Sequence, residues 1–213
     1  MPVSAQAVPF LIPLVVLAVG AGFIFPWAAL PCVLLALFVL FFFRDPERLS
    51  PVGDGLVLAP ADGRVTEVRR DPRGATVSIF LSLFDCHINR SPVAGHVRDV
   101  VHTPGRFHPA WQNRASNTNE RNHLVIDSPG GEYGVTQVAG VLARRIVCRK
   151  RAGDPLARGE RIGLIRFGSR TDLRLPPGVE PLVGLGDRVR GGLTVVAREA
   201  AATERSVVAG GRR

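Results

Sequence analysis

Hydrophobic and polar positions divide the chain into two parts. The first 43 residues contain no Asp, Glu, Lys or Arg, and one membrane-spanning helix needs roughly 20 apolar residues. Pro26 and Pro31 interrupt this block near its middle, where a tight turn would join two spans. We therefore predict that residues 1–43 form a membrane anchor with two transmembrane helices, at about Pro9–Phe25 and Leu30–Phe43.

A cleaved signal peptide is the alternative for this block. A signal peptide has a basic start and a small-residue cleavage site that is followed by polar chain. Here the first charged residue is Arg44 and the apolar stretch is too long. Arg44, Arg48 and many later arginines follow the second span, so the positive-inside rule places the remaining domain on the cytoplasmic side of the cell membrane.

Beyond residue 43 the chain consists of short runs rich in Val and Ile between Gly and Pro residues. This pattern is typical of β-strands, and the one helical candidate is a short segment around Val138–Ile146. We therefore predict a mostly antiparallel β domain over residues 44–213, either a barrel or a sandwich. The expected strands are GLVLAP, GRVTEVRR, ATVSIFLS, GHVRDVVH, NHLVIDS, YGVTQVAG, RIGLIRFG and GLTVVARE.

Two segments of this domain repeat one pattern. PADGRVTEV (60–68) and PVAGHVRDV (92–100) share Pro, Gly, Val and Val at the same spacing, and each predicts a turn that opens a strand. Together with VGLGDRVRGGLTVVA they resemble the folded-over strands of lipoyl and biotinyl carrier domains, which implies a barrel-sandwich-like β core. Those carriers modify a lysine in an exposed hairpin. The only lysine, Lys150, lacks that context, so a carrier function fits poorly.

The formal net charge of +9 lies entirely outside the apolar block. A basic domain that is tethered to a bilayer is attracted to anionic headgroups. Nucleic acid is the rival partner, but the basic residues are scattered and the polar part has few aromatic residues for base stacking. The three cysteines are widely spaced and match no metal-ligand or disulfide pattern. We therefore expect a membrane partner, no nucleic acid and no metal.

Three residues are candidates for chemistry: Asp62 in APADG, His87 in FDCHINRSP and Ser169 in FGS. Each also has a structural interpretation, because DG is a strong turn signal and Gly-Ser is an ordinary turn pair. Cys86 and His87 make a poor nucleophile pair, since neighbours on a strand point to opposite faces. A Ser/His/Asp hydrolase is possible by composition, but FGSRT lacks the GxSxG turn of a nucleophile elbow.

The motifs FFRDPER, PADG, FDCHINRSPVAG, TPGRF, NERN and FGS together resemble the phosphatidylserine decarboxylase family, in its short, membrane-anchored bacterial form. The Gly-Ser of FGS is similar to the self-cleavage site of the family. The resemblance implies that the hydroxyl of Ser169 attacks the carbonyl of Gly168. Elimination then leaves a covalent pyruvoyl (pyruvate) group at position 169, which forms a Schiff base with the amine of phosphatidylserine. The product would be phosphatidylethanolamine.

The implied cofactor suits the composition of the chain. Loss of CO₂ from an amino acid requires an electron sink, and pyridoxal phosphate would need a lysine. Lys150 is the only one, in an arginine-flanked turn. A ketone that the protein makes from its own serine removes that need. The resemblance further implies a heterodimer of a large and a small chain from one precursor that acts on an anionic aminophospholipid. It leaves open whether heterodimers assemble into a higher oligomer.

By the same resemblance, Asp62 and a histidine activate Ser169. Longer members of the family carry two histidines three positions apart, whereas HINR keeps the first as His87 and has Arg90 at the second. We predict that His87 is the base and that Arg90 binds a carboxylate or phosphate of the substrate. Other residues of interest are the alternative bases His96, His102, His108 and His123, and the pair Asn119 and Glu120 of NERN, for which no role follows.

Two other functions remain open at this point. A non-catalytic, membrane-anchored barrel-sandwich adaptor would keep Gly168–Ser169 as a plain turn and remain one chain. A membrane-bound serine hydrolase would react with fluorophosphonates and also remain one chain.

The uncharged N-terminal block gives a first testable prediction. We expect the protein to sediment with membranes and to resist extraction by alkaline carbonate, because a hydrophobic helix holds a protein in the bilayer regardless of surface charge. Immunoblots of the pellet and supernatant provide the measurement. Recovery in the soluble fraction would contradict the anchor.

Overall fold

The computed structural model describes residues 2–105, 119–140, 145–166 and 169–199. The chain divides into two compact units, Met1–Glu47 and Arg48–Arg213.

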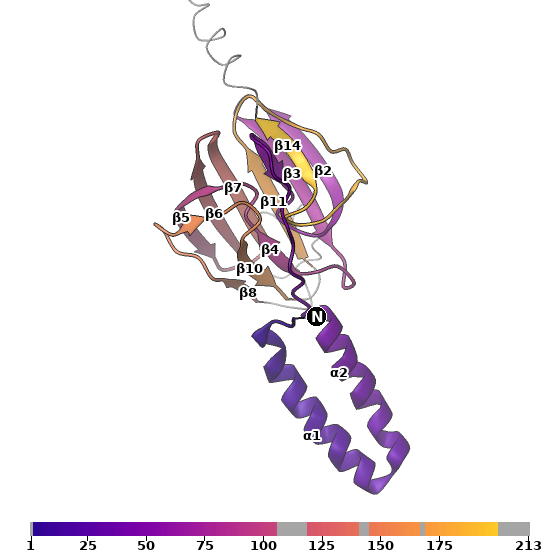
Figure 1. The fold of residues 1–213 in the computed structure, drawn as a ribbon. Helices are drawn as coiled ribbons and strands as arrows, with labels where there is room; N and C mark the ends of the chain where they lie inside the picture. Colours follow the sequence, from indigo (N-terminus) through magenta and orange to yellow (C-terminus); the bar gives the residue numbers. More distant parts are fainter. Residues whose placement is uncertain (1, 106–118, 141–144, 167–168, 200–213) are drawn as a thin grey trace, which may run out of the picture. The chain divides into compact units, whose positions relative to one another are not determined.

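The N-terminal unit is a helical hairpin (Figure 1). With its first turn the first helix covers Ala5–Ile24, 20 residues, which is long and apolar enough to cross a membrane, while the second apolar stretch, Pro26–Phe42, is shorter. Large side chains are widely exposed, for example Phe23 and Ile24 at 88% each, as suits helices that face lipid. The elements are η1 (Ala5–Ala7), α1 (Val8–Ile24), η2 (Pro26–Ala29) and α2 (Leu30–Phe42).

Hydrogen bonds close the open end of this hairpin, where the polar chain begins. The Ser4 N–H donates to the Phe43 carbonyl at 2.8 Å and the Asp45 N–H to the Pro2 carbonyl at 2.8 Å. The guanidinium of Arg44 lies 4.1 Å from the centre of the Phe41 ring, a favourable cation–π geometry. The first charged residue is therefore held at the end of the apolar block.

The described residues of the second unit form three antiparallel sheets. The largest is curled and has the strand order β13-β2-β3-β11-β7-β6-β5-β9 (Figure 1). Two three-stranded sheets, β1-β14-β12 and β4-β10-β8, accompany it. The strands are β1 (Leu56–Leu58), β2 (Gly63–Asp71), β3 (Gly74–Leu81), β4 (Ile88–Arg90), β5 (Gly95–Thr103), β6 (Arg121–Ser128), β7 (Gly131–Ala139), β8 (Ile146–Cys148), β9 (Pro155–Leu156), β10 (Arg161–Ile165), β11 (Ser169–Leu175), β12 (Val179–Pro181), β13 (Arg188–Val189) and β14 (Val195–Glu199).

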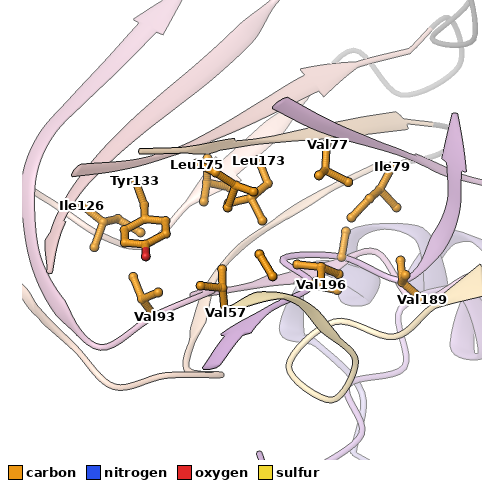
Figure 2. Close-up of a cluster of buried hydrophobic side chains, with 14 of the residues drawn as sticks. Val57, Val77, Ile79, Val93, Ile126, Tyr133, Leu173, Leu175, Val189 and Val196 are labelled. Atoms are coloured by element: carbon orange, nitrogen blue, oxygen red, sulfur yellow. The ribbon is translucent and has the colours of Figure 1, made fainter. Parts of the chain in front are cut away.

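One hydrophobic core joins these sheets. Every second residue of the large sheet points inward, as the strand period requires, and these residues meet side chains from β1, β14 and the turn before β5. Figure 2 shows Val57 and Val196 facing Leu173 and Leu175 across this core. Burial of such a layer supplies most of the favourable free energy of folding.

The sequence repeat is also a structural repeat. Strands β2 and β5 begin at the equivalent glycines Gly63 and Gly95, and each has a bulge two residues later, after Val65 and after Val97. A Cβ atom on either glycine would lie 2.1 Å from a carbonyl oxygen of the neighbouring strand. Only glycine permits this close approach, so the shared glycine sets the same entry into both strands.

The hydrogen bonds around the two bulges match as well. The Val65 N–H donates to the Asp187 carbonyl and the Val97 N–H to the Asp154 carbonyl, both at 2.9 Å. In return, the Gly186 N–H donates to the Val65 carbonyl and the Gly153 N–H to the Val97 carbonyl, both at 2.8 Å. This duplication supports the predicted barrel-sandwich-like core, and the mostly β fold is confirmed.

All eight expected strands are present, but the helix around Val138–Ile146 is a wrong prediction where the structure describes it. Val138 belongs to β7 and Ile146 opens β8, while residues 141–144 lie outside the described residues. The central strand β11 was not expected. The period-two pattern of a strand is nevertheless visible in the sequence of β11. The charged residues Arg170, Asp172 and Arg174 alternate with uncharged residues that point inward.

Candidate functional site

Ser169 is the first residue of the central strand β11. It lies directly opposite Leu81 at the end of β3 and Ala139 at the end of β7. The residue is fully buried, and its Oγ has no hydrogen-bond partner in the described part of the chain. A buried hydroxyl without a partner costs free energy and calls for an explanation. Gly168, the other half of the predicted cleavage site, lies outside the described residues.

The inward face of β11 changes character along the strand. Leu173 and Leu175 belong to the hydrophobic core, whereas Ser169 and Thr171 occupy the same face at the start of the strand. On the opposite face Arg170 bonds to acidic and hydroxyl groups. Ser169 therefore stands where the core gives way to a buried polar region.

The loop between β3 and β4 joins two residues that contact the chain on either side of residues 166–168. Leu81, which precedes this loop, pairs with Ser169, and the carbonyl of His87 at its other end accepts the Ile165 N–H at 3.2 Å. Within the loop, Asp85 accepts hydrogen bonds from the backbone and hydroxyl of Ser82 at 2.8 and 2.6 Å. The loop is thus fixed internally and attached on both sides of residues 166–168.

His87 is 2% exposed, and its Nδ1 lies 3.0 Å from the carbonyl oxygen of Asp85. A carbonyl can only accept, so Nδ1 carries the proton and donates it. In a neutral imidazole this assignment leaves the lone pair on Nε2. The Asp85 carbonyl therefore selects the tautomer in which Nε2 can act as a base.

The alternative histidines are placed less favourably. His123 and His96 project from the outer face of the large sheet, opposite to Ser169, as their registers with Thr136 and Asp127 show. Burial lowers the pKa of His123, whose Nδ1 lies 2.8 Å from the Thr136 hydroxyl. The side chain of His102 is 53% exposed and 3.8 Å from Glu120. His108 lies outside the described residues.

Asp62 lies at the same end of the large sheet as Ser169. Arg64 pairs with Phe80 in an antiparallel register, so the preceding Gly63 and the following Leu81 lie at the same level of the sheet. Leu81 in turn pairs with Ser169. Two strand spacings correspond to about 10 Å. The motifs that contain Asp62, His87 and Ser169, far apart in the sequence, therefore converge at one sheet end.

The carboxylate of Asp62 is fully engaged by Arg48 and the backbone of Gly191. Arg48 Nη1 donates to Oδ1 at 2.5 Å and Nη2 to Oδ2 at 2.8 Å, while the Gly191 N–H donates to Oδ1 at 2.8 Å. Ala94, the equivalent of Asp62 in the second repeat, leads into its strand without a carboxylate. The turn alone therefore does not require Asp62. Its orienting role towards a histidine stays a prediction.

A buried chain of amides beside Ser169 was not predicted from the sequence. Asn122 donates to Gln137 at 3.1 Å, Gln137 to Asn89 at 2.8 Å, and Asn89 to the Thr171 hydroxyl at 3.0 Å. All four side chains are buried, and such fully bonded networks restrain orientation strongly. The sequence signal for this network is the presence of polar residues at strand positions that point inward. The chain of bonds fixes Thr171, two residues from Ser169 on the same face.

The NERN motif supports the strand next to Ser169. The Asn119 amide donates to the carbonyl of Ala139 at 2.9 Å, and the Ala139 N–H donates to the carbonyl of Glu120 at 2.9 Å. Ala139 is the residue opposite Ser169. Asn119 and Glu120 thus have a structural role that the sequence did not suggest.

Positive charge lies just before the Gly168–Ser169 bond. The Arg166 N–H donates to the carbonyl of Arg145 at 3.2 Å, which brings two arginines together. Burial lowers the pKa of Arg166, and the positive charge of Arg145 lowers it further. An anionic group at this position would offset that repulsion.

Arg90, the predicted partner of a substrate carboxylate or phosphate, is the last residue of β4. It is buried, and its Nη1 donates to the Gly159 carbonyl at 2.9 Å. A cavity of about 1200 Å³ lies elsewhere, beside Arg174 and Leu175. These residues end β11, about 20 Å along the strand from Ser169, so that cavity is not part of the site.

Comparison with known proteins shows the family of the chain. The sequence profile of a family described as phosphatidylserine decarboxylase matches residues 35–197. The chain belongs to this family. It is 52% identical over 206 residues to the phosphatidylserine decarboxylase proenzyme of Symbiobacterium thermophilum, an alignment that covers 92% of this chain and 95% of the relative.

Two further relatives of the same name are similar to this family member. The protein from Nitratidesulfovibrio vulgaris is 49% identical over 174 residues, which cover 78% of this chain and 80% of the relative. The protein from Beijerinckia indica is 48% identical over 175 residues, which cover 78% and 75%. The word proenzyme describes a precursor that is processed into the active form.

The Arg48–Asp62 pair provides a stability test. With side chains only 9% and 13% exposed, Asp62→Asn leaves a largely buried arginine without its carboxylate, a loss of about 3 kcal/mol. In an uncut Ser169→Ala background, we expect the thermal unfolding midpoint in detergent to fall by roughly 6–12 °C. Asp71→Asn is the matched control, because it breaks a more exposed bidentate pair with Arg174. Equal shifts in both variants would contradict this assignment.

Proposed function

We propose that this protein decarboxylates phosphatidylserine to phosphatidylethanolamine, with a pyruvoyl group that it makes from its own Ser169. The observation that carries the proposal is the position of Ser169 at the start of a central strand, where its buried Oγ has no hydrogen-bond partner among the residues that the structure describes. Membership of the decarboxylase family supports the same reaction. The catalytic domain would act at the cytoplasmic face of the cell membrane, with the apolar hairpin as its anchor.

The chain's own groups would carry out maturation in two stages. His87 Nε2 takes the hydroxyl proton of Ser169 while Oγ attacks the carbonyl carbon of Gly168, which moves the acyl bond from nitrogen to oxygen. Removal of the Cα proton of residue 169 then expels the Gly168 carboxylate. Addition of water and loss of ammonia leave the ketone. Gly168 has no side chain to obstruct the attack.

The residues around Ser169 fit a pyruvoyl group. The ketone would supply the electron sink for the carbanion that loss of CO₂ creates. Arg145 and Arg166 would attract the anionic headgroup, and the buried His87 would deliver the proton that replaces CO₂. The amide chain that ends at Thr171 would hold the start of β11 in place. Asp62 would act through Arg48, with which it is paired, rather than by direct contact with the substrate.

The two chains would remain together after cleavage. Strand β11 pairs with β3 on one side and β7 on the other along almost its whole length, so the new chain end stays in the large sheet. A serine hydrolase is less well supported, because FGSRT lacks the GxSxG turn of a nucleophile elbow. An adaptor would leave the unpartnered hydroxyl unexplained.

Intact-mass analysis of the purified protein tests the proposal. We expect two chains, Met1–Gly168 and a fragment of 45 residues that begins at position 169. The fragment should be lighter than its sequence by about 17 Da, the mass of the ammonia lost when serine becomes a ketone. Ser169→Ala should give one uncut chain that releases no CO₂ from phosphatidylserine. A single intact chain that still decarboxylates the lipid would overturn the mechanism, and a single inactive wild-type chain would favour the adaptor.

Replacement of His87 tests the base. We expect His87→Ala to slow self-cleavage by about 100-fold or more, within the range for loss of a general base, so that uncut precursor accumulates on a denaturing gel. His96→Ala, on the outer face of the sheet, is the control and should be processed normally. If His87→Ala were cut at the normal rate but inactive, His87 would serve decarboxylation alone.

A further inference from the structure

The buried amide chain beside Ser169 has a direction. Asn122 Nδ2 donates to Gln137 Oε1, Gln137 Nε2 donates to Asn89 Oδ1, and Asn89 Nδ2 donates to Thr171 Oγ1. Thr171 is therefore the receiving end of the chain. A hydroxyl that accepts a hydrogen bond still carries a proton of its own to donate.

The proton of the Thr171 hydroxyl has no acceptor among the residues that the structure describes. Thr171 is 0% exposed, and within that part of the chain the bond from Asn89 is the one hydrogen bond of its hydroxyl. A buried donor without an acceptor costs free energy. Such a group calls for a structural or a chemical reason.

The neighbours of Thr171 on the inward face leave one polar direction for this proton. Across the sheet, Thr171 lies opposite Ile79 on β3 and Gln137 on β7. Ile79 has no acceptor in its side chain, and the side-chain oxygen of Gln137 already accepts from another amide. Along the strand the nearest residues on the same face are Leu173 and Ser169. Of these two, only Ser169 is polar.

The spacing of the two hydroxyls suits an acyl group between them. Residues two apart on one face of a strand have Cβ atoms roughly 7 Å apart. Two hydroxyls that bond directly span at most about 5.6 Å between their Cβ atoms, and Ser169 Oγ has no partner among the described residues. An acyl group on Ser169 Oγ extends the reach to about 7 Å or more, because its carbonyl oxygen lies two bonds beyond Oγ.

We propose that the Thr171 hydroxyl donates a hydrogen bond to the acyl group of Gly168 while Ser169 Oγ carries it. The inference rests on the proposed self-cleavage and assigns a residue to its second stage. In the first stage the carbonyl carbon of Gly168 forms a bond to Oγ and its bond to nitrogen breaks. The hydroxyl proton of Ser169 ends on that nitrogen, and the product is an ester.

The second stage is the one that Thr171 would accelerate. A base removes the Cα proton of residue 169, a Cα–Cβ double bond forms and the Cβ–Oγ bond breaks, so that the electron pair leaves on the Gly168 carboxylate. Negative charge thus develops on the oxygens to which Thr171 donates, and Thr171 keeps its proton throughout. A donor that is fixed in advance stabilises such a charge well, and the bond from Asn89 fixes Thr171 Oγ1.

The ester content of the maturing chain tests this proposal. Thr171→Val removes the hydroxyl and keeps the shape of the side chain. The full chain is made by cell-free synthesis in detergent micelles, and samples are denatured over time in neutral hydroxylamine, which cleaves an ester but leaves peptide bonds intact. Mass spectrometry then separates two 45-residue fragments. An ester yields the fragment with an intact Ser169, whereas completed elimination yields the lighter fragment without its amino group.

We expect Thr171→Val to slow formation of the lighter fragment by about 10- to 100-fold, the range for one hydrogen bond to a developing charge. The fragment with an intact Ser169 should become the main hydroxylamine product. Thr171→Ser retains the hydroxyl and should mature at nearly the parent rate. Asn122→Ala disturbs the far end of the amide chain but keeps the Thr171 hydroxyl, so it should not raise the share of ester. If Thr171→Val matured at the parent rate, or accumulated only the uncut amide, the proposal would be wrong.

Thermal unfolding of each variant in detergent shows whether it folds. If Thr171→Val does not fold, Thr171→Cys takes its place, since a thiol has a similar size and is a weaker donor. It should also enrich the ester, to a smaller degree, and a folded Thr171→Cys chain without ester enrichment would overturn the proposal. A parent chain that never forms the lighter fragment would instead contradict self-cleavage itself.

Discussion

The hydrogen-bonded ladder on both sides of β11 is the constraint on which the rest of the site depends. A serine in a loop would sample many positions, but Ser169 pairs with Leu81 on one strand and Ala139 on the other. Its neighbours in space are fixed in turn, Ala139 by Asn119 and Glu120. The hydroxyl can therefore be buried with no partner among the described residues, because the ladder holds the backbone in place and offsets the free-energy cost.

The same rigidity clarifies the role of the duplicated β-units. Both copies use a glycine, a bulge and a returning turn to build the same corner, yet only the first carries a carboxylate, at Asp62. The fold itself is served equally well by Ala94. The two copies therefore share a backbone geometry but differ in charge. Only the first has a buried carboxylate, which Arg48 neutralises.

Much of this arrangement could be predicted from the sequence, for identifiable reasons. Strands with Val and Ile between glycines follow from local periodicity, and PADG, FDCHINR and FGS point to Asp62, His87 and Ser169. Their convergence at one sheet end could not be predicted, because it depends on the order of strands that are distant in the chain. The pairing of Asp62 with Arg48 and the amide chain from Asn122 to Thr171 also arise only from tertiary packing. Strand β11 was missed although its period-two alternation was visible, since Arg and Asp on its outer face disguise a central strand.

The interleaving of strands has a consequence for the lifetime of the mature protein. Strands β11 and β13 lie in the large sheet, while β12 and β14 lie in a small one with β1. Cleavage before residue 169 would divide these sheets between two polypeptides. The precursor can refold as one chain, but the mature form, once unfolded, would need two chains to find each other again. Its durability would then be set by the rate of unfolding rather than by an equilibrium, so that self-cleavage makes the folded state a kinetically trapped one.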